Sequence, residues 1–158
     1  MARLSAVPAA TAIHAEVAAC RAGTAERRVA RLASGWAVLA ERQVLAGYCL
    51  LLPDPVVPHL NALSPPERAR FLLDMGCLGD ALLAVTGALR INYAMFGNVE
   101  PALHAHLFPR QALEPDSTRT AQPWALDWVA APRYSAQTHG ELQARLAEWL
   151  AVHADGAD

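Results

Sequence analysis

The spacing of apolar residues between Ser64 and Gly87 predicts one long helix. Ser64-Pro65-Pro66-Glu67 marks its start, because Ser can cap a helix, Pro suits the first helical position, and Glu three residues after Ser completes a capping box. Gly87 is typical of a helix end, where glycine adopts a left-handed conformation. Apolar residues recur at intervals of three or four and predict one buried stripe, with Arg68, Arg70 and Asp74 mostly off it: Phe71, Met75, Leu78, Leu82 and Val85.

Two short apolar stretches ahead of this helix predict a pair of antiparallel strands. Residues 36–39 and 48–52 are apolar, aromatic and partly β-branched, and Gly47 lies between them. Pro53 ends the second stretch, since proline has no N–H to donate to a sheet.

Two further strands are predicted after the helix, over residues 90–96 and 103–108, with a turn at Gly97-Asn98. The resulting order is strand, strand, helix, strand, strand. This order predicts an α+β fold.

The two ends of the chain are expected to add helices to this core. Residues 1–34 are rich in Ala and Arg and predict an N-terminal helical segment, whose arginines form a solvated face. Residues 111–135 have no clear period, so they are expected to form an ordered surface segment. In the terminal helix, Thr138 and Glu141 are the expected caps, and the apolar face is Leu142, Leu146, Trp149 and Leu150. We expect a single domain with an N-terminal segment 1–34, a core 35–110 and a C-terminal extension 111–158.

Composition narrows the possible functions. The chain has 158 residues with 54% hydrophobic and 18% charged, which is typical of a folded domain and not of disorder. All 13 basic residues are Arg, so a Walker-type phosphate loop and Schiff-base chemistry, which need Lys, are excluded. The net charge of -2 gives no field for binding a nucleic-acid polymer.

The cysteines and the hydropathy pattern bear on the compartment. Cys20, Cys49 and Cys77 are widely spaced and form no C-x-x-C pair, which favours free thiols in a reducing cytoplasm over disulfides or a zinc site. No apolar run reaches the roughly 20 residues that cross a bilayer. We therefore expect a cytoplasmic protein without a membrane partner.

The most informative stretch contains His104 and His106. Residues two apart on a strand point to one face, so the two imidazoles are expected side by side, with Leu103, Ala105 and Leu107 facing the core. Three interpretations remain open from the residues alone: binding of a metal with a carboxylate such as Glu100, catalysis as nucleophile and acid–base, or structural hydrogen bonding.

This stretch resembles the signature of the histidine triad superfamily, His-φ-His-φ-His-φ-φ, which is often followed by Pro-Arg. Residues 47–53 (GYCLLLP) resemble the family's Gly-His strand, which ends in Pro. The helix start at 63–67 (LSPPE) and the segment 91–98 (INYAMFGN) are also similar, particularly to a bacterial branch of diadenosine tetraphosphate hydrolase-like proteins. The resemblance covers residues 34–110.

The resemblance implies a curved antiparallel sheet of about five strands with a long packed helix, a homodimer, and chemistry on nucleotides. His104 matches the residue that attacks the α-phosphorus of a nucleoside phosphate ester, anhydride or phosphoramidate and forms a nucleotidyl-histidine, which water then cleaves. His106 matches the histidine that contacts the phosphate oxygens, and Asn92 and Asn98 match amide side chains near the phosphates. No metal and no cofactor is implied.

Four positions depart from the family pattern. The first triad histidine is Ala102 and the histidine after the strand glycine is Tyr48. The ribose-binding Asn or Asp falls at Ala40, beside Glu41 as a substitute, and a Ser or Thr near the leaving group is Val99. These departures keep a second hypothesis open, in which the chain binds nucleotides or a partner without turnover.

Several other residues have structural roles as the favoured interpretation. Trp36 is expected in the core rather than in a base pocket, and Arg110 as a partner at a strand end rather than a phosphate contact. Three histidines are expected on the surface of helices or at their ends: His14, His139 and His153.

Overall fold

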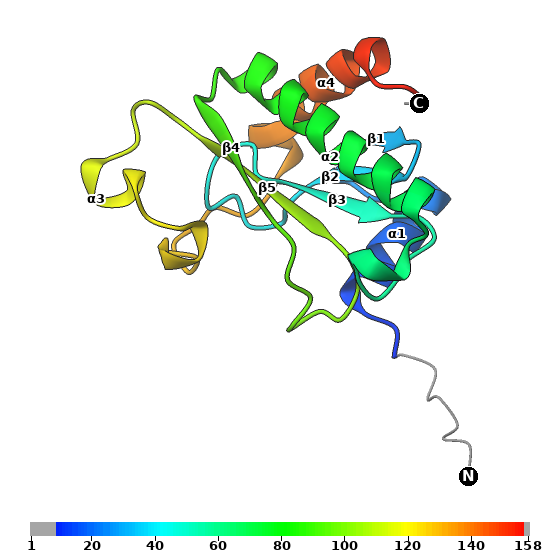
Figure 1. The fold of residues 1–158 in the computed structure, drawn as a ribbon. Coiled ribbons are helices and arrows are strands. Elements are labelled where there is room, and N and C mark those ends of the chain that lie inside the picture. The colour runs from blue at the N-terminus through cyan, green and yellow to red at the C-terminus, as the bar shows by residue number, and fades with distance from the viewer. Residues whose placement is uncertain (1–8, 157–158) are drawn as a thin grey trace.

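The computed structural model describes residues 9–156, so the outermost parts of the predicted segments 1–34 and 111–158 lie outside the described residues. The elements follow one another along the chain as shown in Figure 1. They are α1 (Ala12–Ala22), β1 (Arg28–Leu32), β2 (Gly35–Leu39), β3 (Cys49–Pro53), η1 (Leu60–Ala62), α2 (Pro65–Thr86), β4 (Arg90–Ala94), β5 (Ala105–Arg110), α3 (Asp116–Arg119), η2 (Pro123–Ala125) and α4 (Ala136–His153).

The long helix α2 begins and ends where its sequence predicts. The backbone N–H of Ser64 donates to Glu67 Oε2 at 2.9 Å, which is half of the predicted capping box, and Gly87 has φ of 70° after the last turn. Asp74 differs from the expectation, because it is only 1% exposed. Its carboxylate accepts hydrogen bonds from the backbone N–H of Ser34 and from Arg70, and these bonds compensate its burial.

The five strands form one antiparallel sheet in the order β1-β2-β3-β5-β4. The pairing of β2 with β3 and of β4 with β5 confirms the four predicted strands. The fifth, β1, lies inside the segment predicted to be helical, and its Arg28 and Arg31 lie over the ring of Trp36 at 5.7 and 5.2 Å from the ring centre. These arginines are therefore not simply solvated, since they cover an aromatic side chain.

The helices α2 and α4 lie together on one face of the sheet (Figure 1). Leu51, Ala105 and Leu107 project from the strands into this core, where they meet α2 residues such as Phe71 and α4 residues such as Leu146. All five side chains are fully buried. The predicted inward positions of β5 are confirmed.

The opposite face carries Trp36, Val38, Leu50, His106 and Phe108, and we call it the histidine face. Strand alternation places these residues together, since Leu50 lies opposite both Val38 and His106 in the sheet register.

Side chains from outside the sheet cover two parts of the histidine face. Helix α1 packs Ile13 and Val17 against Trp36 and Val38, which confirms that Trp36 is a core residue. At the far end, Trp128 packs over Tyr48 in a second cluster.

The C-terminal segment connects the two faces. After η2, the chain passes beside Gln43, whose backbone N–H donates to the carbonyl oxygen of Pro132 at 2.8 Å. Helix α4 then follows on the other side of the sheet. Ser135, and not the predicted Thr138, caps α4, because its side chain accepts from the N–H of Thr138. His139 is buried rather than on the surface, since its ring stacks on Tyr134.

No helix within residues 9–156 is long and apolar enough to cross a membrane.

Candidate active site

His104 lies immediately before β5 with its ring held by the backbone. Its Nδ1 is 2.8 Å from the carbonyl oxygen of Ala102. A carbonyl oxygen only accepts, so Nδ1 must carry the proton and donate it. In the neutral ring the proton on Nδ1 leaves Nε2 with a free lone pair, which is the form a nucleophile needs. The side chain is 8% exposed, so its position is set by its surroundings.

His106 is held by Tyr48. The Tyr48 hydroxyl lies 2.6 Å from His106 Nδ1, and Tyr48 is 4% exposed. Within residues 9–156 this nitrogen is the hydroxyl's only recorded side-chain or backbone partner, so the buried O–H donates to it. In the neutral ring the remaining proton is then on Nε2 of His106.

The surroundings keep His106 neutral. Burial, followed by the nearby His104, lowers the pKa of His106 from 6.5 to about 4. Burial also raises the pKa of the Tyr48 hydroxyl, which therefore stays protonated. The two histidine rings lie 4.7 Å apart between centres. The pair thus offers one lone pair, on His104, next to one N–H donor, on His106.

Aromatic rings surround this pair. Phe108 stacks on Tyr48 at 4.2 Å, and Trp124 from η2 meets the His106 ring edge-on at 5.2 Å. Phe96, from the β4–β5 connection, meets Trp124 edge-on at 4.8 Å. Phe96 and Trp124 are 61% and 44% exposed, so both rings have free surface beside the histidines.

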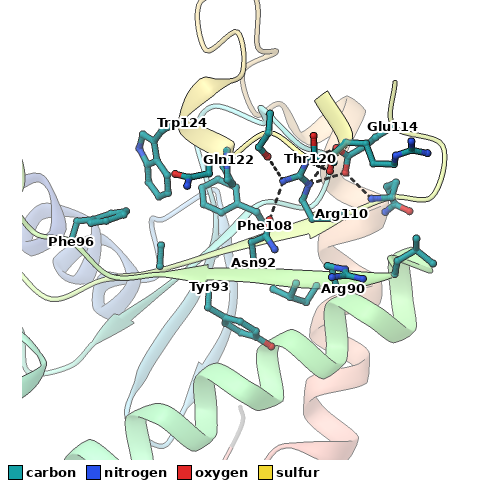
Figure 2. Close-up of a pocket in the computed structure, with 17 residues that line it drawn as sticks. Arg90, Asn92, Tyr93, Phe96, Phe108, Arg110, Glu114, Thr120, Gln122 and Trp124 are labelled. Atoms are coloured by element: carbon teal, nitrogen blue, oxygen red, sulfur yellow. Dashed lines mark hydrogen bonds and ion pairs between the residues drawn. The ribbon is translucent and has the colours of Figure 1, made fainter. Parts of the chain in front are cut away.

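A cavity of about 830 Å³ opens next to these rings, between the strands β4 and β5 and the segment that follows β5 (Figure 2). Phe96, Phe108 and Trp124 lie at one end, and Arg90 lies at the other, near Arg110 (Figure 2). We call this cavity the β4–β5 pocket. His104 and His106 are not among its lining residues; His106 contacts the lining rings of Phe108 and Trp124, and His104 lies next to His106.

Arg110 holds the walls of the pocket together. It forms a buried ion pair with Glu114 at 2.7 Å and donates to the carbonyl oxygen of Ala121 and to Oδ1 of Asn92. Its guanidinium holds the pKa of the Glu114 carboxyl below its ordinary value. Arg110 therefore has the structural role expected from its place at the strand end.

The other predicted site residues lie in different places. Asn92 lines the β4–β5 pocket, whereas Asn98 is exposed in the β4–β5 connection and is not among the pocket residues. Tyr48 lies behind His106 and contacts its ring, so burial separates it from any substrate. Glu41 is exposed and forms an ion pair with Arg133. The structure thus brings Asn92 and Tyr48 close to the histidines or their pocket, but not Asn98 or Glu41.

Sequence reasoning missed Phe96 and Trp124. Trp124 follows β5 in a stretch with no period, so no local pattern places it beside His106. A Pro-Trp pair in a polar segment, Pro123-Trp124, was the available hint of an ordered aromatic on a loop.

The metal interpretation lacks a third ligand. Among residues 9–156, no group of three His, Cys, Asp or Glu side chains lies close enough together to hold a metal ion.

Neither protein-family models nor curated proteins give a match to this chain. Solved structures do, and all those described here are histidine triad proteins. A histidine triad protein from Sinorhizobium meliloti 1021 is similar with a TM-score of 0.66 and 22% identity, over 77% of this chain and 87% of that one. One from Marinobacter aquaeolei VT8 has a TM-score of 0.66 and 18% identity, over 90% and 98%. A hypothetical histidine triad nucleotide-binding protein from Sulfolobus tokodaii strain 7 has a TM-score of 0.68 and 15% identity, over 87% and 91%. At such identities the likeness concerns the backbone, and it shows that this chain has the fold of the histidine triad proteins.

Proposed function

We propose that the protein is a nucleotide hydrolase or nucleotidyl transferase that acts at the α-phosphate of a nucleotide through His104. The observation that carries this proposal is the complementary pair of imidazoles, with a free Nε2 on His104 and an N–H on Nε2 of His106. The structural neighbour from Sulfolobus tokodaii, described as a nucleotide-binding protein, supports the same substrate class.

In the first step the lone pair of His104 Nε2 attacks the α-phosphorus, and the bond from phosphorus to the leaving group breaks. The leaving group takes that bond's electron pair, and a nucleotidyl-histidine remains. In the second step a water oxygen attacks the same phosphorus, the P–N bond breaks, and its electrons return to Nε2, while the proton of the water passes to solvent. His106 acts through its Nε2–H, as a hydrogen-bond donor to a non-bridging phosphate oxygen.

The low pKa of His106 bears on the leaving group. With a pKa of about 4, His106 is a neutral imidazole near pH 7 and has no imidazolium proton to transfer, so its Nε2–H stabilises charge through a hydrogen bond only. A phosphate leaving group departs as an anion and needs no proton, whereas an amine does. Phosphoanhydrides such as dinucleoside polyphosphates are therefore the favoured substrates over phosphoramidates and esters.

A second candidate function is nucleotide binding without turnover. Ala102 supports it, because this position carries a buried methyl group in the cluster under α1 where the family pattern has an imidazole. Tyr48 supports it too, because a hydroxyl of raised pKa exchanges no proton near neutral pH.

We also propose that the protein is a homodimer, joined through β4. This strand lies at the edge of the sheet, and its flank exposes Leu89 (65%) and Tyr93 (44%). An unpaired edge with exposed apolar side chains favours association. Light scattering with size-exclusion chromatography tests this, and a monomeric mass at micromolar concentration would count against it.

The function is tested by incubating the protein with diadenosine tetraphosphate, an adenosine phosphoramidate and a nucleotidyl sugar, with products followed by phosphorus NMR. We expect a nucleoside monophosphate from the anhydride, and a rate at least roughly a thousandfold lower for His104→Ala. His153→Ala is the matched control, because His153 is exposed on α4 and contacts Trp149. Binding with no turnover by the wild type would support the second candidate instead.

A further inference from the structure

The β4–β5 pocket has two chemically different ends. Near the histidines, Phe96, Phe108 and Trp124 present aromatic surface. The amide of Asn92 lines the pocket opposite Phe108, its partner in the sheet register, and the guanidinium group of Arg90 lines it at the end away from the histidines (Figure 2). A flat ring that carries hydrogen-bonding atoms on its edge fits both ends at once.

Elsewhere on the histidine face the space is filled. Under α1, Trp36 and Val38 are 8% and 0% exposed and lie against Ile13 and Val17. At the opposite end, Ala40 is 3% exposed in the cluster with Trp128. A ligand that reaches the histidines therefore has the β4–β5 pocket as the large opening beside them.

We propose that the β4–β5 pocket binds the base of the nucleotide whose α-phosphate reaches His104, with the base stacked on Trp124. This inference rests on the proposed function and names where the substrate's own base lies. The alternative occupant with the same chemistry is the base of the leaving group.

The spacing fits a nucleoside 5′-phosphate. From His104 to His106 the ring centres are 4.7 Å apart, and from His106 to Trp124 they are 5.2 Å apart. The ring centres of His104 and Trp124 are thus no further apart than the sum of these two distances, which is on the scale of a nucleoside 5′-phosphate. Trp124 is 44% exposed, and this exposed part of the side chain is available for stacking.

Asn92 supplies polar recognition at the edge of the base. Arg110 carries donors only, so the Asn92 atom bonded to it at 3.0 Å is the carbonyl oxygen Oδ1. Within residues 9–156 the amide nitrogen of Asn92 has no hydrogen-bond partner, so it can donate two hydrogen bonds, and the side chain is half-buried in the pocket wall. This arrangement selects a ring whose facing edge carries acceptor atoms.

Calorimetric titration with adenosine monophosphate and with ribose 5-phosphate, which lacks the base, tests the inference. We expect the wild type to bind the nucleotide more tightly than the sugar phosphate. We expect Trp124→Leu to weaken nucleotide binding by roughly 5- to 150-fold, the loss typical of one base-stacking ring. Its binding of ribose 5-phosphate should not change. Leu113→Ala is the control, because Leu113 is 95% exposed beside the pocket without lining it.

The outcomes separate this inference from the proposed function. If the wild type binds neither ligand and turns over no nucleotide, both fail. If it binds the nucleotide and Trp124→Leu binds it equally well, the inference alone fails. A Trp124→Leu variant that raises KM for diadenosine tetraphosphate but leaves adenosine monophosphate binding intact places the leaving group's base in the pocket, and this also overturns the inference. Trp124→Phe keeps a ring and should retain most of the affinity, which guards against a loss through misfolding.

Discussion

Acidification should destabilise the protein through His106. The unfolded chain takes up a proton on this residue near its ordinary pKa of 6.5, whereas the folded protein does so only near pH 4. Between these two pH values the unfolded state binds more protons, so the free energy of unfolding falls as the pH falls. The slope approaches about 1.4 kcal/mol per pH unit. From pH 7.5 to pH 5, which is one and a half units below 6.5, the loss from His106 is therefore about 2 kcal/mol.

Urea denaturation followed by tryptophan fluorescence measures this loss at the two pH values. His106→Gln removes the titrating group, so it should lose about 2 kcal/mol less than the wild type between pH 7.5 and pH 5. His153→Gln, at an exposed position, should lose as much as the wild type. The titration of the His106 ring protons by NMR gives its pKa directly. A midpoint near 6.5, or equal losses in His106→Gln and the wild type, would refute the reasoning.

Two further perturbations test the packing around the sheet. A methyl group at Gly79 would collide with the Tyr93 hydroxyl, so in Gly79→Ala the half-exposed Tyr93 ring must move, and this displacement should offset the gain in helix propensity. Gly76→Ala on the same helix meets no atom within 4 Å and should stabilise by about 0.5–1 kcal/mol in urea unfolding. Equal effects of the two would contradict this packing. Arg110→Met leaves the buried carboxylate of Glu114 without its partner and should cost about 3–5 kcal/mol. The added change Glu114→Leu should restore only part of this loss, because the carbonyl oxygens that Arg110 also binds stay without a donor. A loss below about 1 kcal/mol for Arg110→Met would show that the pair is not buried in solution.

Helix α2 shows which parts of the fold local sequence determines. Its cap, its stripe and its end depend on contacts between residues a few positions apart, and each was predicted from Ser64, the apolar spacing and Gly87. The predicted strands are confirmed for a similar reason, because short runs of apolar, aromatic and β-branched residues between turn residues favour strands, and β2 is buried along its whole length.

Strand β1 shows why other parts could not be predicted. Its pairing with β2 shifts register between Arg28 and Ala30, and this irregularity breaks the alternation that marks a strand. Its arginines pack over Trp36 on the neighbouring strand β2, a contact that the sequence of β1 alone does not reveal. The burial of His139 has a similar origin, because a helix's own sequence does not show which neighbour covers it.

The candidate site combines both kinds of information. The placement of His104 and His106 on one side follows from their spacing of two. The partner of His106 does not, because the Tyr48 hydroxyl reaches it from the position just before β3, 58 positions earlier in the chain. Trp124 comes from a loop whose course is set by Arg110 and its bonds to backbone carbonyls, and no repeat in the loop sequence encodes that course.

The crossing of the C-terminal segment to the α4 face also affects how the protein matures during synthesis. The Gln143 side chain on α4 donates to the carbonyl oxygens of Glu26 and Arg28, at sequence separations of 117 and 115. A nascent chain that ends before α4 has no donor from this helix for those two carbonyls, although it already contains every strand and both histidines. Ribosomes must therefore translate almost the whole described chain before its earliest strand acquires its final neighbours.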